Sequence, residues 1–122
     1  MNTKEVANRL VAMCRQGQNI EAIDELYGKS IVSQEMPGIP NAAVQGIDNV
    51  RKKSQDWLAS VEEFHSSEIS EPVIAGNHFT IKMNFDVTFK ERGRQKMEEV
   101  CVFKVSNGKI VNEQFFYDVP ER

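Results

Sequence analysis

The sequence predicts an α+β fold in which three helices come first and a mainly antiparallel sheet follows. The main observation is the strict alternation of apolar and polar residues over 79–90, a period of two that is typical of a half-buried strand. Similar alternating runs occupy residues 95–105 and 109–119, and turn-forming segments separate them. Before these strands, apolar residues recur at helical spacing. The chain is therefore expected to end in an antiparallel meander whose apolar face is covered by the helices.

Length and composition predict a single domain over residues 1–122. Of the residues, 40% are hydrophobic and 27% are charged, which are ordinary values for a soluble globular protein. The net charge is −3, and lysine and arginine are scattered, which argues against a nucleic acid or an anionic membrane as a partner. No apolar run approaches the roughly 20 residues that span a bilayer. We therefore expect a cytoplasmic protein.

Helical periodicity and capping residues define the three predicted helices. The first covers residues 3–16, and the spacing of Asn2 and Glu5 fits a capping box at its start. The second is short and is capped by Asn19. The third covers residues 48–64, where apolar side chains recur every three or four positions. All three helices have one apolar face, which we expect to pack on the sheet.

Two further strands are predicted between the helices and the meander. Residues 30–35 form a short strand, and residues 36–41 form a loop, because the prolines in that loop cannot continue a central strand. Residues 67–74 form the next strand, which turns at Gly76-Asn77 into the meander. The predicted order is therefore α-α-β-α-β-β-β-β.

The turns of the meander decide which side chains face the helices. Treating Arg92-Gly93 and Asn107-Gly108 as two-residue turns fixes the register of the three long strands. The face toward the helices then carries Met83, Phe85, Val87, Val100, Val102, Phe115 and Tyr117. The opposite face carries Lys82, Asn84, Asp86, Glu99, Cys101, Phe103, Asn112, Gln114 and Phe116. A bulge at either turn would exchange the faces, and Asp86 would then be a rival acid–base residue in a cavity lined by the polar band of Asn84, Asp86, Glu99, Asn112 and Gln114. The preferred alternative is that this mixed polar and apolar face forms a dimer interface.

The order of elements, together with segments 24–35 and 107–117, resembles the SnoaL-like family of the ketosteroid isomerase-like, nuclear transport factor 2-like superfamily. The resemblance extends over essentially the whole chain. It implies a cone-shaped barrel, also called a cystatin-like architecture, in which a curved sheet surrounds a pocket roofed by the helices. It also implies homodimers packed through the sheet. Isomerases, cyclases, dehydratases, hydrolases and non-catalytic proteins share this fold, so the fold alone does not define the function.

The resemblance makes Glu35 the candidate general base. In the isomerases a carboxylate on the first strand moves a proton, and Glu35 matches that position in its spacing from Tyr27. The isomerases also use a tyrosine on the first helix, where this chain has Leu10. Their protonated aspartate on a late strand corresponds here to Cys101 or Val102, neither of which is a strong hydrogen-bond donor. The usual machinery for steroid isomerisation is therefore not expected to be complete.

The other candidate site residues share the predicted inward face, the third helix or the pocket mouth. They are Tyr117, Trp57, Met83, Phe85, Val102 and His65. Tyr117 is predicted to donate a hydrogen bond to a ligand oxygen or to Glu35. His65 follows the third helix, whose end borders the pocket mouth in the family that the chain resembles. The alternative for the aromatic residues is a structural role, in which they fill the hydrophobic core.

No cofactor or metal is predicted. The glycines are spread singly, so no phosphate-binding loop is present, and histidine, cysteine and carboxylate residues lack the spacing of metal ligands. Cys14 and Cys101 are expected to be small buried thiols. No nucleophile with a neighbouring histidine can be identified.

The leading hypothesis is a domain that binds a small, mostly apolar ligand and transfers a proton next to a carbonyl group, with Glu35 as base. The alternative is a non-catalytic pocket or a dimeric interaction module. A third hypothesis, a hydrolase or dehydratase, requires His65 within hydrogen-bond reach of Glu35 or Asp86. The proton-transfer hypothesis requires Glu35 to be buried with a perturbed pKa, and the interaction-module hypothesis does not.

Overall fold

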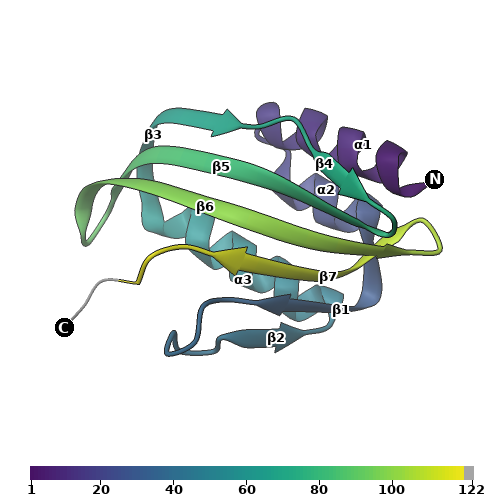
Figure 1. Ribbon diagram of the computed structural model, residues 1–122. Helices are drawn as coiled ribbons and strands as arrows, with labels where there is room; N and C mark the ends of the chain where they lie inside the picture. Colours follow the sequence, from purple (N-terminus) through teal and green to yellow (C-terminus); the bar gives the residue numbers. More distant parts are fainter. Residues whose placement is uncertain (120–122) are drawn as a thin grey trace.

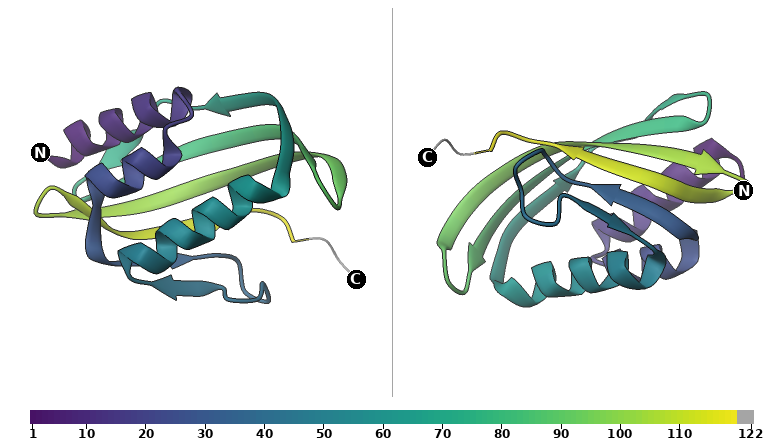
Figure 2. Two further views of the ribbon diagram at one scale, coloured as in Figure 1. Left: turned by 180° about the vertical axis from the view of Figure 1, so that it is seen from behind. Right: turned by 90° about the horizontal axis from the view of Figure 1, so that it is seen from below.

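A curved seven-stranded sheet carries three helices on one of its faces (Figures 1 and 2). The computed structural model describes residues 1–119. Neighbouring strands follow the order β2-β1-β7-β6-β5-β3, and the short strand β4 pairs with β5. The described pairs are antiparallel apart from the parallel pair of β1 and β7. The predicted α+β class and curved sheet are confirmed, and the sheet remains open between β2 and β3.

The helices are α1 (Thr3–Arg15), α2 (Asn19–Leu26) and α3 (Ile47–Ser60). The predicted capping box opens α1: the Asn2 side chain accepts from the Glu5 N–H at 2.8 Å, and the Glu5 carboxylate accepts from the Asn2 N–H at 3.0 Å. Helix α3 crosses beneath the curved sheet (Figure 2, right). None of the helices within residues 1–119 has both the length and the apolar character needed to cross a lipid bilayer.

The strands are β1 (Tyr27–Gln34), β2 (Ala43–Gln45), β3 (Val61–Ile69), β4 (Val73–Ala75), β5 (His78–Phe89), β6 (Gly93–Ser106) and β7 (Lys109–Phe116). The three long alternating runs of the sequence correspond to β5, β6 and β7. Strand β1 begins at Tyr27, earlier than predicted, because this residue already pairs with Ile110 of β7. The predicted strand over 67–74 is interrupted, and β3 and β4 pair separately with β5.

Helix α3 is shorter than predicted. It ends at Ser60, whose hydroxyl donates to the Trp57 carbonyl at 2.6 Å, and Val61 is already extended. Residues 61–64 therefore belong to β3 and not to the helix. The reason for the error is that Val61 and Phe64 continue the helical spacing, although a β-branched residue at the helix end also favours a strand.

The loop between β5 and β6 differs from the predicted turn, and this exchanges the faces of β6. Phe89 pairs with Gly93, so the loop contains Lys90-Glu91-Arg92 instead of the predicted two-residue turn. Gly93 has a φ of 76°, as in hairpins with a left-handed residue after a three-residue loop. The inward residues of β6 are consequently Met97, Glu99, Cys101, Phe103 and Val105. Val100 and Val102 lie on the outer face, contrary to the prediction.

A second irregularity, a bulge at Val111, gives the side chains of β7 the orientation that the sequence predicts. The turn at Asn107-Gly108 has two residues as predicted, because Ser106 pairs with Lys109. Val111 then forms a bulge, because the partner of Val105 is Ile110 and the partner of Lys104 is Asn112. The two shifts cancel on β7, so Phe115 pairs with Cys101 and faces the helices as expected.

The main core lies between α1, α2 and the sheet. Its largest fully buried side chains include Leu26, Ile31, Phe79, Phe103 and Ile110. A smaller cluster of Val61, Val87 and Phe89 packs against Trp57. Between these clusters, polar side chains from β1, α3, β6 and β7 meet on the concave face.

Candidate functional site

Glu35 lies directly after β1, and both of its carboxylate oxygens have partners. Oε1 accepts a hydrogen bond from Tyr117 Oη at 2.8 Å, and Oε2 lies 2.7 Å from Lys53 Nζ. Its side chain is 18% exposed. The hydrogen bond predicted between Tyr117 and Glu35 is therefore present. Burial and the neighbouring Glu35 charge raise the pKa of Tyr117 well above its usual range, so its hydroxyl remains a donor.

Lys53 connects Glu35 to the interior of the sheet. It projects from α3, and its Nζ donates to Ser33 Oγ at 2.9 Å as well as to Glu35. The Nζ also lies 5.1 Å from the centre of the Phe115 ring. The side chain is 27% exposed, so the cation is partly desolvated.

Glu113 lies behind Lys53 and is buried. The hydroxyl of Tyr27 donates to one carboxylate oxygen, and Ser33 Oγ donates to the other at 2.7 Å. The parallel pairing of β1 and β7 positions Ser33 opposite Glu113. Burial raises the pKa of Glu113, whereas the two hydroxyl donors and Lys53 act in the opposite direction. Five hydrogen bonds thus join Tyr27, Glu113, Ser33, Lys53, Glu35 and Tyr117 into one chain.

Glu99 is a third carboxyl group on the concave face. It lies on β6 opposite Met83, and the Cys101 thiol donates to it at 3.6 Å. Burial, followed by repulsion from Glu35, raises the pKa of Glu99 to about 7. Within residues 1–119, none of the ion pairs includes Glu99. Its environment therefore favours the protonated form of Glu99, whereas each carboxylate oxygen of Glu35 has a hydrogen-bond donor, Lys53 or Tyr117.

Aromatic side chains form an apolar wall beside these polar groups. The Trp57 ring centre lies 5.9 Å from those of Phe64 and Phe85, and 6.0 Å from that of Phe89. Phe64 is 45% exposed, so part of this wall is open to solvent. The site therefore combines two carboxyl groups of different character with an accessible aromatic surface. That combination suits a small ligand with an apolar body and one or two polar atoms.

The comparison with known proteins identifies the family of this chain. Residues 1–117 match the SnoaL-like domain family. The chain belongs to the SnoaL-like domain family. No curated protein matches the chain significantly.

Solved structures show the same fold. A protein from Mesorhizobium loti, described provisionally as a SnoaL-like polyketide cyclase, is 35% identical with a TM-score of 0.91, and the match covers 96% of this chain and 100% of that one. A protein with a cystatin-like fold from Xanthomonas campestris is 16% identical, with a TM-score of 0.81 and coverage of 98% and 92%. A protein with a ketosteroid isomerase-like fold from Catenulispora acidiphila, solved with trimethylamine, is 18% identical, with a TM-score of 0.73 and coverage of 94% and 86%.

Several predicted site residues of this SnoaL-like domain lie together on its concave face. Glu35 and Tyr117 are hydrogen-bonded, Trp57 packs against Phe85, and Met83 pairs with Glu99 across the sheet. Whether they bind a ligand stays a prediction, but their arrangement is compatible with one site.

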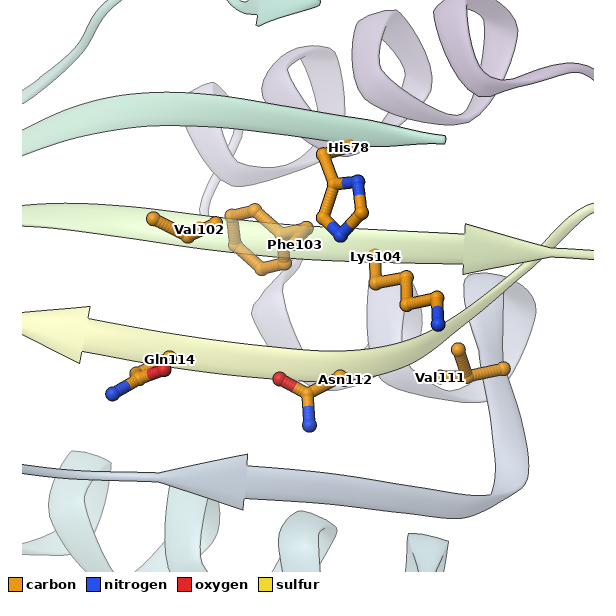
Figure 3. Close-up of a pocket in the computed structure, with 7 residues that line it drawn as sticks. All are labelled: His78, Val102, Phe103, Lys104, Val111, Asn112 and Gln114. Atoms are coloured by element: carbon orange, nitrogen blue, oxygen red, sulfur yellow. The ribbon is translucent and has the colours of Figure 1, made fainter. Parts of the chain in front are cut away.

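Val102 does not belong to this group. The three-residue loop before β6 turns its side chain to the outer face. There it lines a hollow of about 360 Å³ together with His78, Phe103, Lys104, Val111, Asn112 and Gln114 (Figure 3). The prediction that Val102 lies on the face toward the helices is therefore wrong.

His65 also points away from the concave face. Its Nε2 lies 2.7 Å from Thr88 Oγ1, and its Nδ1 lies 3.1 Å from a Glu63 oxygen. In the described part of the chain, no hydrogen bond joins His65 to Glu35 or Asp86, and Asp86 pairs instead with Arg94 at 2.9 Å. The reason is that β3 begins before His65 and turns it toward the outward-facing Thr88. The histidine–carboxylate pair required by the hydrolase hypothesis is not formed.

Sequence reasoning missed much of the hydrogen-bonded chain, namely Tyr27, Ser33, Lys53 and Glu113. It assigned the third carboxyl group, Glu99, to the outer face, and only a shift of register would have brought it inside. The available signal was the alternation in β7, which puts Glu113 on the same face as Phe115. In residues 1–119, no group of three or more histidine, cysteine or acidic residues is arranged to hold a metal ion.

Proposed function

We propose that this SnoaL-like domain binds a small, mostly apolar carbonyl compound on its concave face and moves a proton next to the carbonyl group. The proposal requires no cofactor. The observation that supports it most is that Glu35, held by Lys53 and Tyr117, lies near enough to Glu99 for its charge, together with burial, to raise the pKa of Glu99 to about 7. Such a pair divides naturally into a base and an acid.

In the proposed reaction Glu35 is the general base and Glu99 the acid. Glu35 removes a proton from the carbon next to the carbonyl, so the C–H bond breaks and an O–H bond forms on Glu35. The electron pair of the C–H bond forms a C=C bond, and the negative charge develops on the carbonyl oxygen. Protonated Glu99 donates a hydrogen bond to that oxygen. In a β,γ-unsaturated ketone Glu35 then gives its proton to the γ carbon, so that the carbonyl re-forms and the C=C bond moves into conjugation with it. Glu99 would thus supply the late-strand donor that alignment with the isomerases placed at Cys101 or Val102.

The aromatic wall supports an apolar ligand. Trp57 and Phe85 lie on the concave side, and Phe64 is open to solvent. A planar ring placed against them would gain apolar burial and aromatic contacts. Trp57 is the chain's only tryptophan, so its fluorescence reports directly on binding there.

The test uses 3-cyclohexen-1-one, a simple ketone whose double bond moves into conjugation after proton transfer. Formation of 2-cyclohexen-1-one is followed by ultraviolet absorbance. We expect Glu35→Gln to lower the rate about 100-fold or more. Glu99→Gln retains a donor but cannot ionise, so it should keep much of the activity and remove the loss of activity above about pH 7. Unchanged turnover in Glu35→Gln would contradict the proposal.

The alternative is a non-catalytic, dimeric interaction module, and the outer face of the sheet supports it. Val100 and Phe116 are paired across β6 and β7, and each is 43% exposed. Two apolar side chains surrounded by polar residues are typical of the centre of an interface. We therefore propose a homodimer packed through this face, which is compatible with either function.

We also propose a cytoplasmic location. Cys14 and Cys101 are both free thiols, and burial raises the pKa of each. Free cysteines are typical of reducing compartments. Fractionation of the producing cells with an antibody to the chain tests this, and recovery in a secreted or periplasmic fraction would contradict it.

A further inference from the structure

The ammonium group of Lys53 has three hydrogen-bond donors, and the proposed reaction does not use all of them. Two of its three N–H groups donate to Glu35 and Ser33. The third has no acceptor among residues 1–119, and the head group lies beside the Phe115 ring. A lysine cation with an available donor, next to a carboxylate base, can interact with a ligand oxygen as well as with the base.

We propose that Lys53 is a further catalytic residue, whose ammonium group neutralises Glu35 before proton transfer and the enolate oxygen after it. The inference rests on the proposed function and assigns a residue that this function does not require. When Glu35 takes the proton, its negative charge disappears and an equal charge develops on the substrate oxygen. The ammonium group then exchanges one anionic partner for another, and the net charge of the site does not change.

The geometry supports this exchange because Lys53 is already beside the base. Its Nζ lies 2.7 Å from Glu35 Oε2, and the side chain is only 27% exposed. Charge interactions are stronger in such partly desolvated surroundings than in water. A fixed cation stabilises the developing enolate without the reorganisation that water molecules would need.

Glu113 acts as a positioning residue for Lys53. It is 4% exposed, and Ser33 links it to the ammonium group through hydrogen bonds of 2.7 and 2.9 Å. With Tyr27 and Ser33 both donating to it, the carboxylate has a donor on each oxygen. When Glu35 becomes neutral, the hydrogen bonds from Lys53 to Ser33 and from Ser33 to Glu113 hold the flexible lysine side chain in place.

The experiment uses Glu35→Gln as a mimic of the protonated base. In this variant Lys53 loses its anionic partner, so it should bind the oxygen of an enolate-like anion more strongly. The probe is 4-nitrophenol, whose ionised and neutral forms have different absorption spectra. We expect Glu35→Gln to bind the phenolate at least about tenfold more tightly than wild type, and Glu35→Gln/Lys53→Met to lose that gain.

Lys52→Met is the matched control, because Lys52 precedes Lys53 on α3 and pairs with exposed Asp56 at 2.8 Å. The double variant Glu35→Gln/Lys52→Met should bind the phenolate as tightly as Glu35→Gln alone. Lys53→Gln replaces Lys53→Met if the latter does not fold, as judged by circular dichroism. Equal phenolate affinity with and without Lys53 would overturn the inference. Failure of the proposed function has a different signature, namely unchanged ketone turnover in Glu35→Gln.

Discussion

Phe79 and Phe103 pair directly across β5 and β6 and stack in the core, with ring centres 4.7 Å apart and an interplanar angle of 16°. Each side chain is 1% exposed. This contact exists because the three-residue loop after Phe89 turns Phe103 inward. In the register predicted from sequence, Phe103 would lie on the outer face with Phe116.

Phe103→Ala should destabilise the protein strongly. Removal of a buried phenylalanine side chain leaves a cavity and costs about 3–5 kcal/mol of unfolding free energy. Phe116→Ala, on the outer face at 43% exposure, is the control and should change the stability of the monomer by less than about 1 kcal/mol. Urea denaturation followed by Trp57 fluorescence measures both. Similar losses in the two variants would show that the register is not the one described.

Glu99→Gln should stabilise the protein at pH 8 but not at pH 4. The pKa of Glu99 rises from 4.5 to about 7 on folding, mainly through burial. Below pH 4.5 the Glu99 carboxyl is protonated in the folded and the unfolded state, so it does not lower the free energy of unfolding. As the pH rises through 7, its ionisation destabilises the folded state. Allowing for partial exposure, we expect a gain of about 2 kcal/mol at pH 8.

The control for this measurement is Glu98→Gln. Glu98 is the neighbouring residue on β6, its side chain points outward, and it lies 3.5 Å from Lys82 at 75% exposure. Its substitution should have little effect at either pH. A stabilisation by Glu99→Gln that does not depend on pH would refute the raised pKa.

Neither tyrosine should ionise normally in the folded protein. The chain contains only Tyr27 and Tyr117, and burial is the main reason that the pKa of each lies above its ordinary value. Spectrophotometric titration should therefore show no tyrosinate step centred at about pH 10 until the protein unfolds. Tyr27→Phe and Tyr117→Phe separate the two contributions. A normal step that disappears in one variant would assign an accessible hydroxyl to that residue.

Charges on the outer face should dissociate the proposed homodimer. Val100→Glu and Phe116→Glu each put a carboxylate at the apolar centre of this face, where its desolvation would oppose association. Sedimentation velocity at micromolar concentration should show a dimer for wild type and a monomer for both variants. Val73→Glu is the control, since Val73 is 70% exposed on β4. A wild-type monomer would refute the homodimer.

Period and capping chemistry predicted the three helices and the long strands β5, β6 and β7, but not the short strand β2 or the end of α3 at Ser60. Local backbone preferences determine the alternation in β5, β6 and β7 and the capping box of Asn2 and Glu5. Such preferences can be predicted from residues that are neighbours in the sequence. The face of β6 was predicted wrongly, because it depends on whether two or three residues connect Phe89 to the next strand. One residue in a loop reverses every side chain of the strand that follows.

The same dependence explains what was missed in the candidate site. Glu35 and Tyr117 were identified through family resemblance and a face assignment that two compensating shifts left intact. Glu99 was placed outside because of the β6 register. Lys53 was overlooked because its contact with Glu35 joins α3 to the end of β1, a tertiary relationship that periodicity does not encode.

The parallel pairing of β1 with β7 links the candidate site to the folding of the whole chain. The bonds from Tyr27 and Ser33 to Glu113, and from Tyr117 to Glu35, join residues 86, 80 and 82 positions apart. Contacts between such distant segments form late and slowly, because a long loop must close first. A partly folded molecule with only its local hairpins would have no site. Binding of the proposed ligand would thus report the fully folded population, and it should disappear together with the global unfolding transition.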